Sequence, residues 1–135
     1  MTRKAQAGLE HAVPKVMRGR RAQSSGLRAE QAACDALTRD GWQVLGRRVR
    51  TAAGEIDILA ERDGLLAVVE VKHRKTLAQA VVSLSARQRA RLMLAAEIVL
   101  GENQGWGQAG VRFDVIMVDG AFTVRRVIDA FRLEG

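Results

Sequence analysis

Two short apolar runs separated by a turn signal constrain the fold of this chain more than any other feature. Residues 56–60 and 65–71 are rich in Ile, Leu and Val, and they flank the segment Glu61-Arg62-Asp63-Gly64. Runs of this composition form buried strands, and Asp-Gly between two of them is typical of a β-hairpin with a two-residue turn. The sequence therefore predicts an antiparallel strand pair inside the fold.

Two segments have the periodicity of helices. Over residues 27–39 the apolar positions approximate one helical face, and Ser24 or Ser25 can cap its start. A second helix is predicted over 85–100, with its first residue as the N-cap and Gly101 as the stop signal. Each helix is expected to bury one face against the strands.

Three further strands complete the predicted fold. They are expected at 42–50, 111–118 and 122–128, and the glycine-rich loop before the second of them either exposes Trp106 or tucks it against the domain. The order is helix, strand, hairpin, helix, two strands. This order predicts an α/β fold, a mixed β-sheet flanked by helices.

Length and charge set the domain organisation. At 135 residues and 47% hydrophobic, the chain is long enough for one ordinary core. Residues 1–25 hold six Lys/Arg against one acid, a net +5, whereas the other 110 hold sixteen against fourteen, a net +2. We expect a flexible basic arm at 1–25 and one domain at 26–135. No stretch approaches the roughly 20 apolar residues of a membrane span, so we expect a cytoplasmic protein.

Several common chemistries lack their motifs. The single cysteine, Cys34, cannot form an internal disulfide and is expected to be a small core residue. The sequence contains no Cys/His cluster with zinc spacing, no phosphate-binding glycine loop and no His-Glu-x-x-His. With 4% aromatics and no Tyr, it also offers no row of rings for stacking unpaired bases.

The hairpin brings charged residues together. A two-residue turn at Asp63-Gly64 places Asp57 opposite Glu70 and Glu55 opposite Lys72, with all four side chains on one face. Opposed carboxylates repel, and burial makes the repulsion worse. A divalent cation removes this conflict.

Mg²⁺ or Mn²⁺ suits such a pair. Magnesium is typically held by one or two carboxylates, waters and substrate phosphate. Lys72, two residues after Glu70, would lie beside the ion and stabilise charge on a reacting phosphate. The alternative is a cross-strand ion pair between Glu55 and Lys72, with Asp57 and Glu70 facing water. Residue types alone leave both readings open.

The motif residues resemble a known family. The stretch 54–60 (Gly-Glu-Ile-Asp-Ile-Leu-Ala), followed by 69–74 (Val-Glu-Val-Lys-His-Arg), is similar to the YraN-like family of small bacterial proteins. That family resembles the PD-(D/E)xK nucleases, which have a restriction-endonuclease-like fold, and archaeal Holliday-junction resolvases. The resemblance runs from about Gly26 to Ile128 and includes 112–115 as a late strand. The superfamily's proline is absent, because Ile56 stands before the aspartate.

The resemblance implies roles for individual residues. Asp57 and Glu70 match the metal-binding carboxylates, and Lys72 matches the catalytic lysine. Glu30 matches an extra acidic position that resolvase-like members bring to the metal, although a glutamate there is otherwise usually exposed to solvent. Gln88 falls where such domains place a polar residue on the helix after the motif strand.

The sequence thus predicts a metal-dependent endonuclease acting on branched or duplex DNA in recombination or repair, with a homodimer as an open possibility. The alternatives are a DNA-binding module that keeps the fold without cutting, and a protein-interaction domain. His73 is expected on the sheet face opposite the metal. The residues expected to contact nucleic acid are Arg47, Arg48, Arg50, Arg74, Arg87, Gln88 and Arg91.

Overall fold

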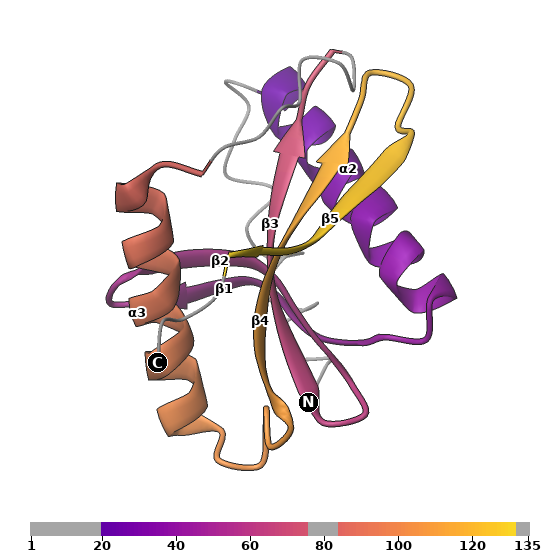
Figure 1. Cartoon of the computed structure of the whole chain (residues 1–135). Helices are drawn as coiled ribbons and strands as arrows, with labels where there is room; N and C mark the ends of the chain where they lie inside the picture. The colour runs from indigo at the N-terminus through magenta and orange to yellow at the C-terminus, as the bar shows by residue number, and fades with distance from the viewer. Residues whose placement is uncertain (1–19, 76–83, 132–135) are drawn as a thin grey trace.

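A computed structural model describes residues 20–75 and 84–131 of the chain. Figure 1 shows helix α3 on one side of a twisted β-sheet and helix α2 on the other. None of the helices in the described part is long and apolar enough to cross a membrane. The elements in chain order are α2 (Arg20–Arg39), β1 (Gln43–Thr51), β2 (Gly54–Arg62), β3 (Leu65–His73), α3 (Ala86–Glu102), β4 (Gly110–Val118) and β5 (Val124–Phe131).

The described strands form one sheet in the order β1-β2-β3-β4-β5. Strands β3 and β4 run parallel, and the other neighbours are antiparallel. Parallel neighbours need a crossover, and the segment between β3 and β4 contains α3. The predicted mixed sheet flanked by helices is confirmed.

The β2–β3 hairpin has the predicted turn. Asp63 and Gly64 both have positive φ, 52° and 81°, as a type I′ turn requires. The turn fixes the register, so that Leu59 pairs with Val68 as predicted. The paired residues run from Arg62–Leu65 only as far as Ile58–Val69. The expected continuation of the ladder to Asp57 and Glu70 is therefore wrong.

Both helices differ from prediction at one end. Helix α2 begins at Arg20, so Ser24 and Ser25 lie within it and do not cap it. Part of the predicted arm is thus helical, while residues 1–19 lie outside the described residues. Helix α3 begins after Ser85, as predicted. It continues through Gly101 to a C-cap at Asn103, because glycine is tolerated in a last helical turn.

The last strand begins two residues later than predicted. The side chain of Asp119 accepts hydrogen bonds from the amides of Ala121 and Thr123, which extends the turn after β4. Strand β5 therefore starts at Val124. Phe122 lies in the turn with a φ of 61°.

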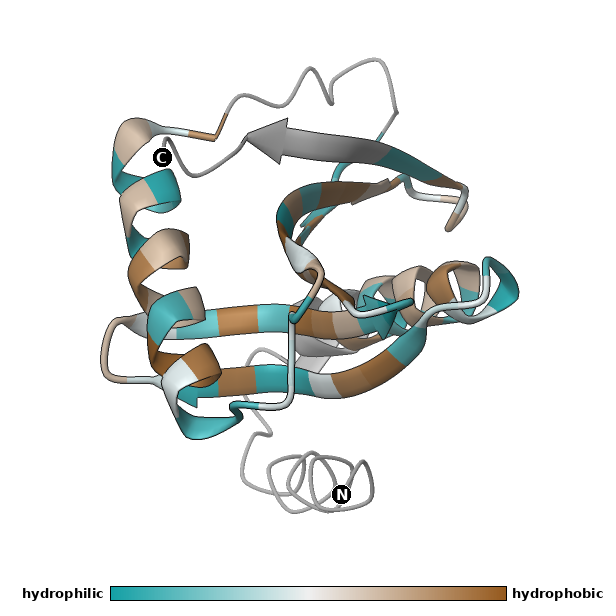
Figure 2. Ribbon diagram, turned by 60° about the horizontal axis from the view of Figure 1, so that its bottom comes forward, coloured by the Kyte–Doolittle hydropathy of each residue, from teal (hydrophilic) through white to brown (hydrophobic). Residues whose placement is uncertain are grey.

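Apolar side chains form a core on each face of the sheet. Leu92, Ala95, Ala96 and Val99 of α3 pack on one face, and Trp106 is tucked partly buried against the same cluster. Ala29, Ala33, Cys34 and Leu37 of α2 pack on the other face together with Trp42. Figure 2 shows hydrophobic and hydrophilic residues alternating along the strands that separate these cores. Cys34 is a buried core residue, as expected.

Candidate active site

The candidate site lies where β2 and β3 stop pairing. Beyond Ile58, β2 remains paired with β1, while β3 remains paired with β4. The backbone N–H of Val71 on β3 therefore loses its partner strand, and it donates instead to Oδ2 of Asp57 at 2.8 Å. The Asp57 carboxylate thus takes the place of a backbone acceptor between the two strands.

Glu70 lies among cations on the side of the sheet covered by α3. Its Oε2 is 3.3 Å from Nζ of Lys72, and its Oε1 is 3.9 Å from Nη2 of Arg91 on α3. The side chains of Glu70 and Lys72 are only 12% and 14% exposed. Because both are nearly buried, their ion pair is shielded from water and salt more than a surface pair would be.

The alternative prediction, an ion pair between Glu55 and Lys72, is wrong. The carboxylate of Glu55 is paired with Arg50, 3.7 Å away, at the exposed edge of the sheet. Asp57 and Glu70 do not face water either, because both side chains are largely covered. The predicted grouping of Glu70 with Lys72 on one face is confirmed, whereas Glu55 does not join them.

Burial makes Asp57 an unusual acid. The pKa of Asp57 is raised to about 7, chiefly by burial. The negative charge of Glu70 raises this pKa further, and those of Glu30 and Glu55 do so more weakly. The hydrogen bond from Val71 opposes them. Asp57 therefore shares its surroundings with carboxylates that it repels. Hard oxygen ligands in such conflict suit a divalent cation such as Mg²⁺.

Glu30 reaches this region from α2 and is buried, so the solvent-exposed alternative is wrong. Burial raises its pKa against the opposing charge of Arg48. Nε of Arg48 donates to both carboxylate oxygens, at 3.1 and 3.3 Å. Within the described residues no group of three or more His, Cys, Asp or Glu is arranged to hold a metal ion. The structure therefore does not bring Glu30 together with Asp57 and Glu70 as a third ligand, and Glu30 acts on Asp57 through its charge.

Gly54 and Arg91 complete the site, and no local sequence pattern connects these two residues. Nη1 of Arg91 donates to the backbone oxygen of Glu55 at 3.0 Å, so α3 is joined to the start of β2. Gly54 has a φ of 136°, and a Cβ there would lie 2.8 Å from Cδ of Arg91. A glycine is therefore required both by the backbone and by the packed arginine.

The residues expected to contact nucleic acid fall into three groups. Arg47 donates to Gln31, Arg48 to Glu30, and Gln88 accepts from the amide of Ser85 in a capping box, so these three have structural partners. Arg91 belongs to the carboxylate site. The exposed members are Arg50, Arg74 and Arg87.

A buried charge cluster at β4 was missed. Asp114 accepts from Arg112 at 3.0 Å and from Arg126 at 2.7 Å, and its side chain is fully buried. Both guanidinium groups also lie over the ring of Trp42. The cluster ties β4 and β5 to the start of β1, so the acidic residue of segment 112–115 has a structural role.

The fold and the site define a class: an α/β protein with a carboxylate pair and a lysine where two strands separate. The chain belongs to a family described as "Uncharacterised protein family UPF0102", which matches residues 29–118. That match includes the part of α2 that carries Glu30 and the whole of every element from β1 to β4. The predicted membership of the YraN-like family is confirmed to this extent.

Bacterial relatives agree with this assignment. A UPF0102 protein of Granulibacter bethesdensis is 61% identical over 120 residues, which are 89% of this chain and 76% of the relative. A UPF0102 protein of Azorhizobium caulinodans is 40% identical over 90% of this chain and 93% of its own length. A UPF0102 protein of Acidiphilium cryptum is 43% identical over 85% of this chain and 89% of its own length.

Proposed function

We propose that this protein is a metal-dependent endonuclease that cuts branched or duplex DNA in the cytoplasm during recombination or repair. The observation that carries the proposal is the grouping of Asp57, Glu70 and Lys72 where β2 and β3 separate. The resemblance of these residues to the PD-(D/E)xK nuclease motif supports it. So does the net charge of +7, which favours a polyanionic partner.

Asp57 and Glu70 would hold the ion. Oδ2 of Asp57 accepts from Val71, which fixes the carboxylate and leaves Oδ1 for a cation. When bound, Mg²⁺ supplies Lewis-acid stabilisation of phosphate charge and lowers the pKa of a bound water. The donor set suits this ion, because magnesium is commonly held by one or two carboxylates with substrate phosphate.

Lys72 would act on the scissile phosphate. Its ammonium group is held beside Glu70 at 3.3 Å and is nearly buried, so it is positioned before substrate arrives. In hydrolysis, a water oxygen forms a bond to phosphorus, the bond to the leaving oxygen breaks, and that oxygen takes up a proton. A fixed cation beside the phosphate stabilises the negative charge that grows in this step.

One observation favours a second candidate, a DNA-binding module that does not cut. Lys72 and Arg91 both lie within 4 Å of Glu70, so its charge is already countered without an ion. In that case the carboxylate pair stabilises the fold only, and the exposed arginines would account for DNA binding.

Calorimetry with Mg²⁺ and Mn²⁺ separates the two candidates. The wild type is compared with Asp57→Asn and Glu70→Gln, and Asp35→Asn serves as the matched control because Asp35 is an exposed acid on α2. The endonuclease proposal expects saturable binding that is lost in the first two variants only. The same proteins are then incubated with junctions, flaps, duplexes and single strands, with and without EDTA. Cleavage without metal binding contradicts the proposal. The absence of both metal binding and cleavage contradicts it as well.

A further inference from the structure

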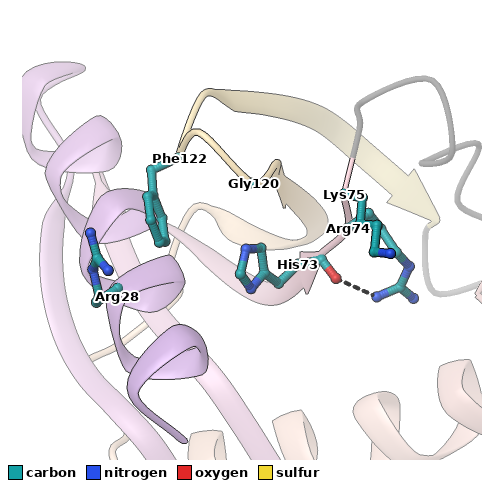
Figure 3. A pocket seen from close by; sticks show the side chains of 6 residues that line it. All are labelled: Arg28, His73, Arg74, Lys75, Gly120 and Phe122. Atoms are coloured by element: carbon teal, nitrogen blue, oxygen red, sulfur yellow. Dashed lines mark hydrogen bonds between the residues drawn. The ribbon is translucent and has the colours of Figure 1, made fainter. Parts of the chain in front are cut away.

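A basic pocket lies on the sheet face opposite the carboxylates. Its volume is about 410 Å³, and Figure 3 shows the side chains that surround it. Arg28 comes from α2, three residues come from the end of β3, and two come from the turn between β4 and β5. The lining residues are Arg28, His73, Arg74, Lys75, Gly120 and Phe122.

An aromatic ring organises the pocket. The guanidinium carbon of Arg28 is 4.3 Å from the centroid of the Phe122 ring. The imidazole of His73 stacks on the same ring with centroids 5.6 Å apart and planes at 29°. Figure 3 shows Arg28 and His73 both adjacent to Phe122. A single ring therefore restrains two side chains whose N–H groups donate hydrogen bonds.

The turn between β4 and β5 holds Phe122 in a strained backbone conformation. Phe122 has a φ of 61°, a left-handed conformation that non-glycine residues rarely adopt. Asp119 sets the turn, because its backbone oxygen accepts from the amide of Phe122 and its side chain from those of Ala121 and Thr123. Strain of this kind clusters at ligand-binding sites. Gly120 also donates to the backbone oxygen of Lys75, which joins the turn to the end of β3.

Among the residues that the structure describes, no acid lines this pocket. Three of its lining residues are cations, one is a histidine, and none is a carboxylate. Among the described residues, no acid lies within ion-pair distance of Arg28, Arg74 or Lys75. By contrast, Arg48 and Arg126 are engaged by Glu30 and Asp114. Arg74 donates to the backbone oxygen of His73 at 2.9 Å, so Arg28 and Lys75 are the lining cations that remain for an anion, and such cations suit phosphate oxygens.

The pocket and the carboxylate site share one strand end. Lys72 and His73 are consecutive on β3, so their side chains point to opposite faces. Duplex DNA carries one charge per about 1.7 Å of its axis, so a nucleic acid bound at Lys72 presents further phosphates close by. We propose that the pocket binds a backbone phosphate of the nucleic acid, outside the reaction centre. The identity of this polymer rests on the proposed function.

Duplex binding in EDTA tests the proposal without any cleavage. Fluorescence anisotropy compares Arg28→Gln and Lys75→Gln with Arg39→Gln, which removes the same charge from the exposed far end of α2. Loss of a phosphate contact should weaken binding about five- to tenfold at low salt and reduce the slope of log K against log salt by about one. The Arg39 variant should change both far less. Equal effects of all three substitutions overturn the proposal.

Lys75→Gln keeps the test independent of folding. Lys75 does not contact the Phe122 ring, so its loss leaves the Arg28–Phe122–His73 stack in place. If Arg28→Gln melts at a lower temperature than wild type, the duplex affinity of Lys75→Gln alone decides whether the pocket binds a backbone phosphate. The comparison holds whether or not a metal ion binds, because every variant is measured in EDTA. A failed nuclease assay therefore leaves the pocket result standing.

Resonances of His73 identify the source of the phosphate. The imidazole proton signals, assigned with His73→Gln, are followed at fixed pH during titration with inorganic phosphate or with a short duplex. The proposal expects shifts with the duplex at micromolar concentration, and shifts with inorganic phosphate only at far higher concentration. Saturation by inorganic phosphate with no response to duplex would make this a pocket for a free anion and would overturn the nucleic acid assignment.

Discussion

The backbone N–H of Val71 donates a 2.8 Å hydrogen bond to Oδ2 of Asp57. This contact joins β2 and β3 just beyond the last pair of their backbone ladder, Ile58 and Val69. An unsatisfied N–H in a sheet interior is costly. By accepting from Val71, Asp57 stabilises the structure at the point where the two strands separate. The residue therefore has two separable roles, as a hydrogen-bond acceptor and as a negative charge.

Substitutions at Asp57 should separate these roles. Asp57→Asn keeps an acceptor for Val71 and removes the charge, whereas Asp57→Ala removes both. Both should lose metal binding, but the alanine variant should be less stable than the asparagine variant by about 1–3 kcal/mol, because it leaves the amide unsatisfied. Urea denaturation in EDTA measures the difference. Equal stabilities would show that the hydrogen bond contributes nothing.

The raised pKa of Asp57 predicts how stability changes with pH. Its folded pKa is about 7 against an ordinary 3.8, so the folded state holds a proton that the unfolded state releases between these values. The free energy of unfolding should therefore fall as pH rises from about 4 to 7, by an amount on the order of a few kcal/mol, and level off above.

Urea denaturation at intervals from pH 5 to 8, in EDTA, measures this effect. Asp57→Asn should lose most of the decline and keep the smaller part due to Glu30, whose pKa is raised in the same direction. Saturating Mg²⁺ should also raise the free energy of unfolding of the wild type above pH 7, because an ion that binds only the folded state stabilises it. An unchanged decline in Asp57→Asn would assign the pH dependence to other groups.

Local signals were sufficient to predict the strands and the hairpin register. Asp63-Gly64 specifies a turn with two positive φ values, and a two-residue turn leaves one register for the runs beside it. Glu70 and Lys72 then share a face through simple alternation. These features depend on residues within a few positions of each other.

The features that failed depend on distant segments. The ladder ends at Ile58 because β1 and β4 retain the two strands separately, which the hairpin sequence does not encode. Arg91 reaches Glu70 from the helix of the crossover connection, about twenty residues further along the chain. Phe122 was expected in a strand, yet the Asp119 side chain extends the turn and brings the ring to Arg28. No periodicity in one segment reports such contacts.

Arg91 should affect both stability and metal binding. Its hydrogen bond to the Glu55 backbone oxygen joins α3 to β2, and its charge opposes a cation at Glu70. Arg91→Met should lower the free energy of unfolding by about 1 kcal/mol, since the side chain is partly exposed, and should raise Mg²⁺ affinity severalfold. Arg87→Met, an exposed arginine one turn earlier, is the control. Identical behaviour of the two variants would remove Arg91 from the site.

The basic segment before α2 should contribute to DNA binding. Residues 2–19 contain Arg3, Lys4, Lys15 and Arg18 against a single acid, Glu10. Because α2 begins at Arg20, deletion should stop at residue 19. The deleted protein should keep its melting temperature and show a shallower salt dependence of duplex binding, measured by anisotropy. An unchanged slope would mean that this segment does not contact phosphates.

Lys72 should be separable from the metal-binding carboxylates. Its ammonium group acts on the phosphate or the attacking water, so Lys72→Ala should bind duplex about as well as wild type and should bind Mg²⁺ at least as tightly, because a cation beside Glu70 is removed. Cleavage should nevertheless slow by about 100-fold or more, the usual effect of removing a fixed charge from a transition state. Single-turnover cleavage, calorimetry and anisotropy measure the three quantities on the same preparation.

Lys72→Arg and Lys72→Met define what the lysine supplies. Arginine keeps the charge, but its planar guanidinium is larger and differently hydrated, so it should not restore the rate in a position that is 14% exposed. Methionine fills similar space without charge, and it should cleave as slowly as alanine while melting higher, because it keeps the packing of the side-chain stem. If lysine only neutralises Glu70, the alanine and methionine variants should lose stability, the arginine variant should not, and all three should cut DNA at the wild-type rate. That combination would leave Lys72 as an ion-pair partner and remove it from the reaction.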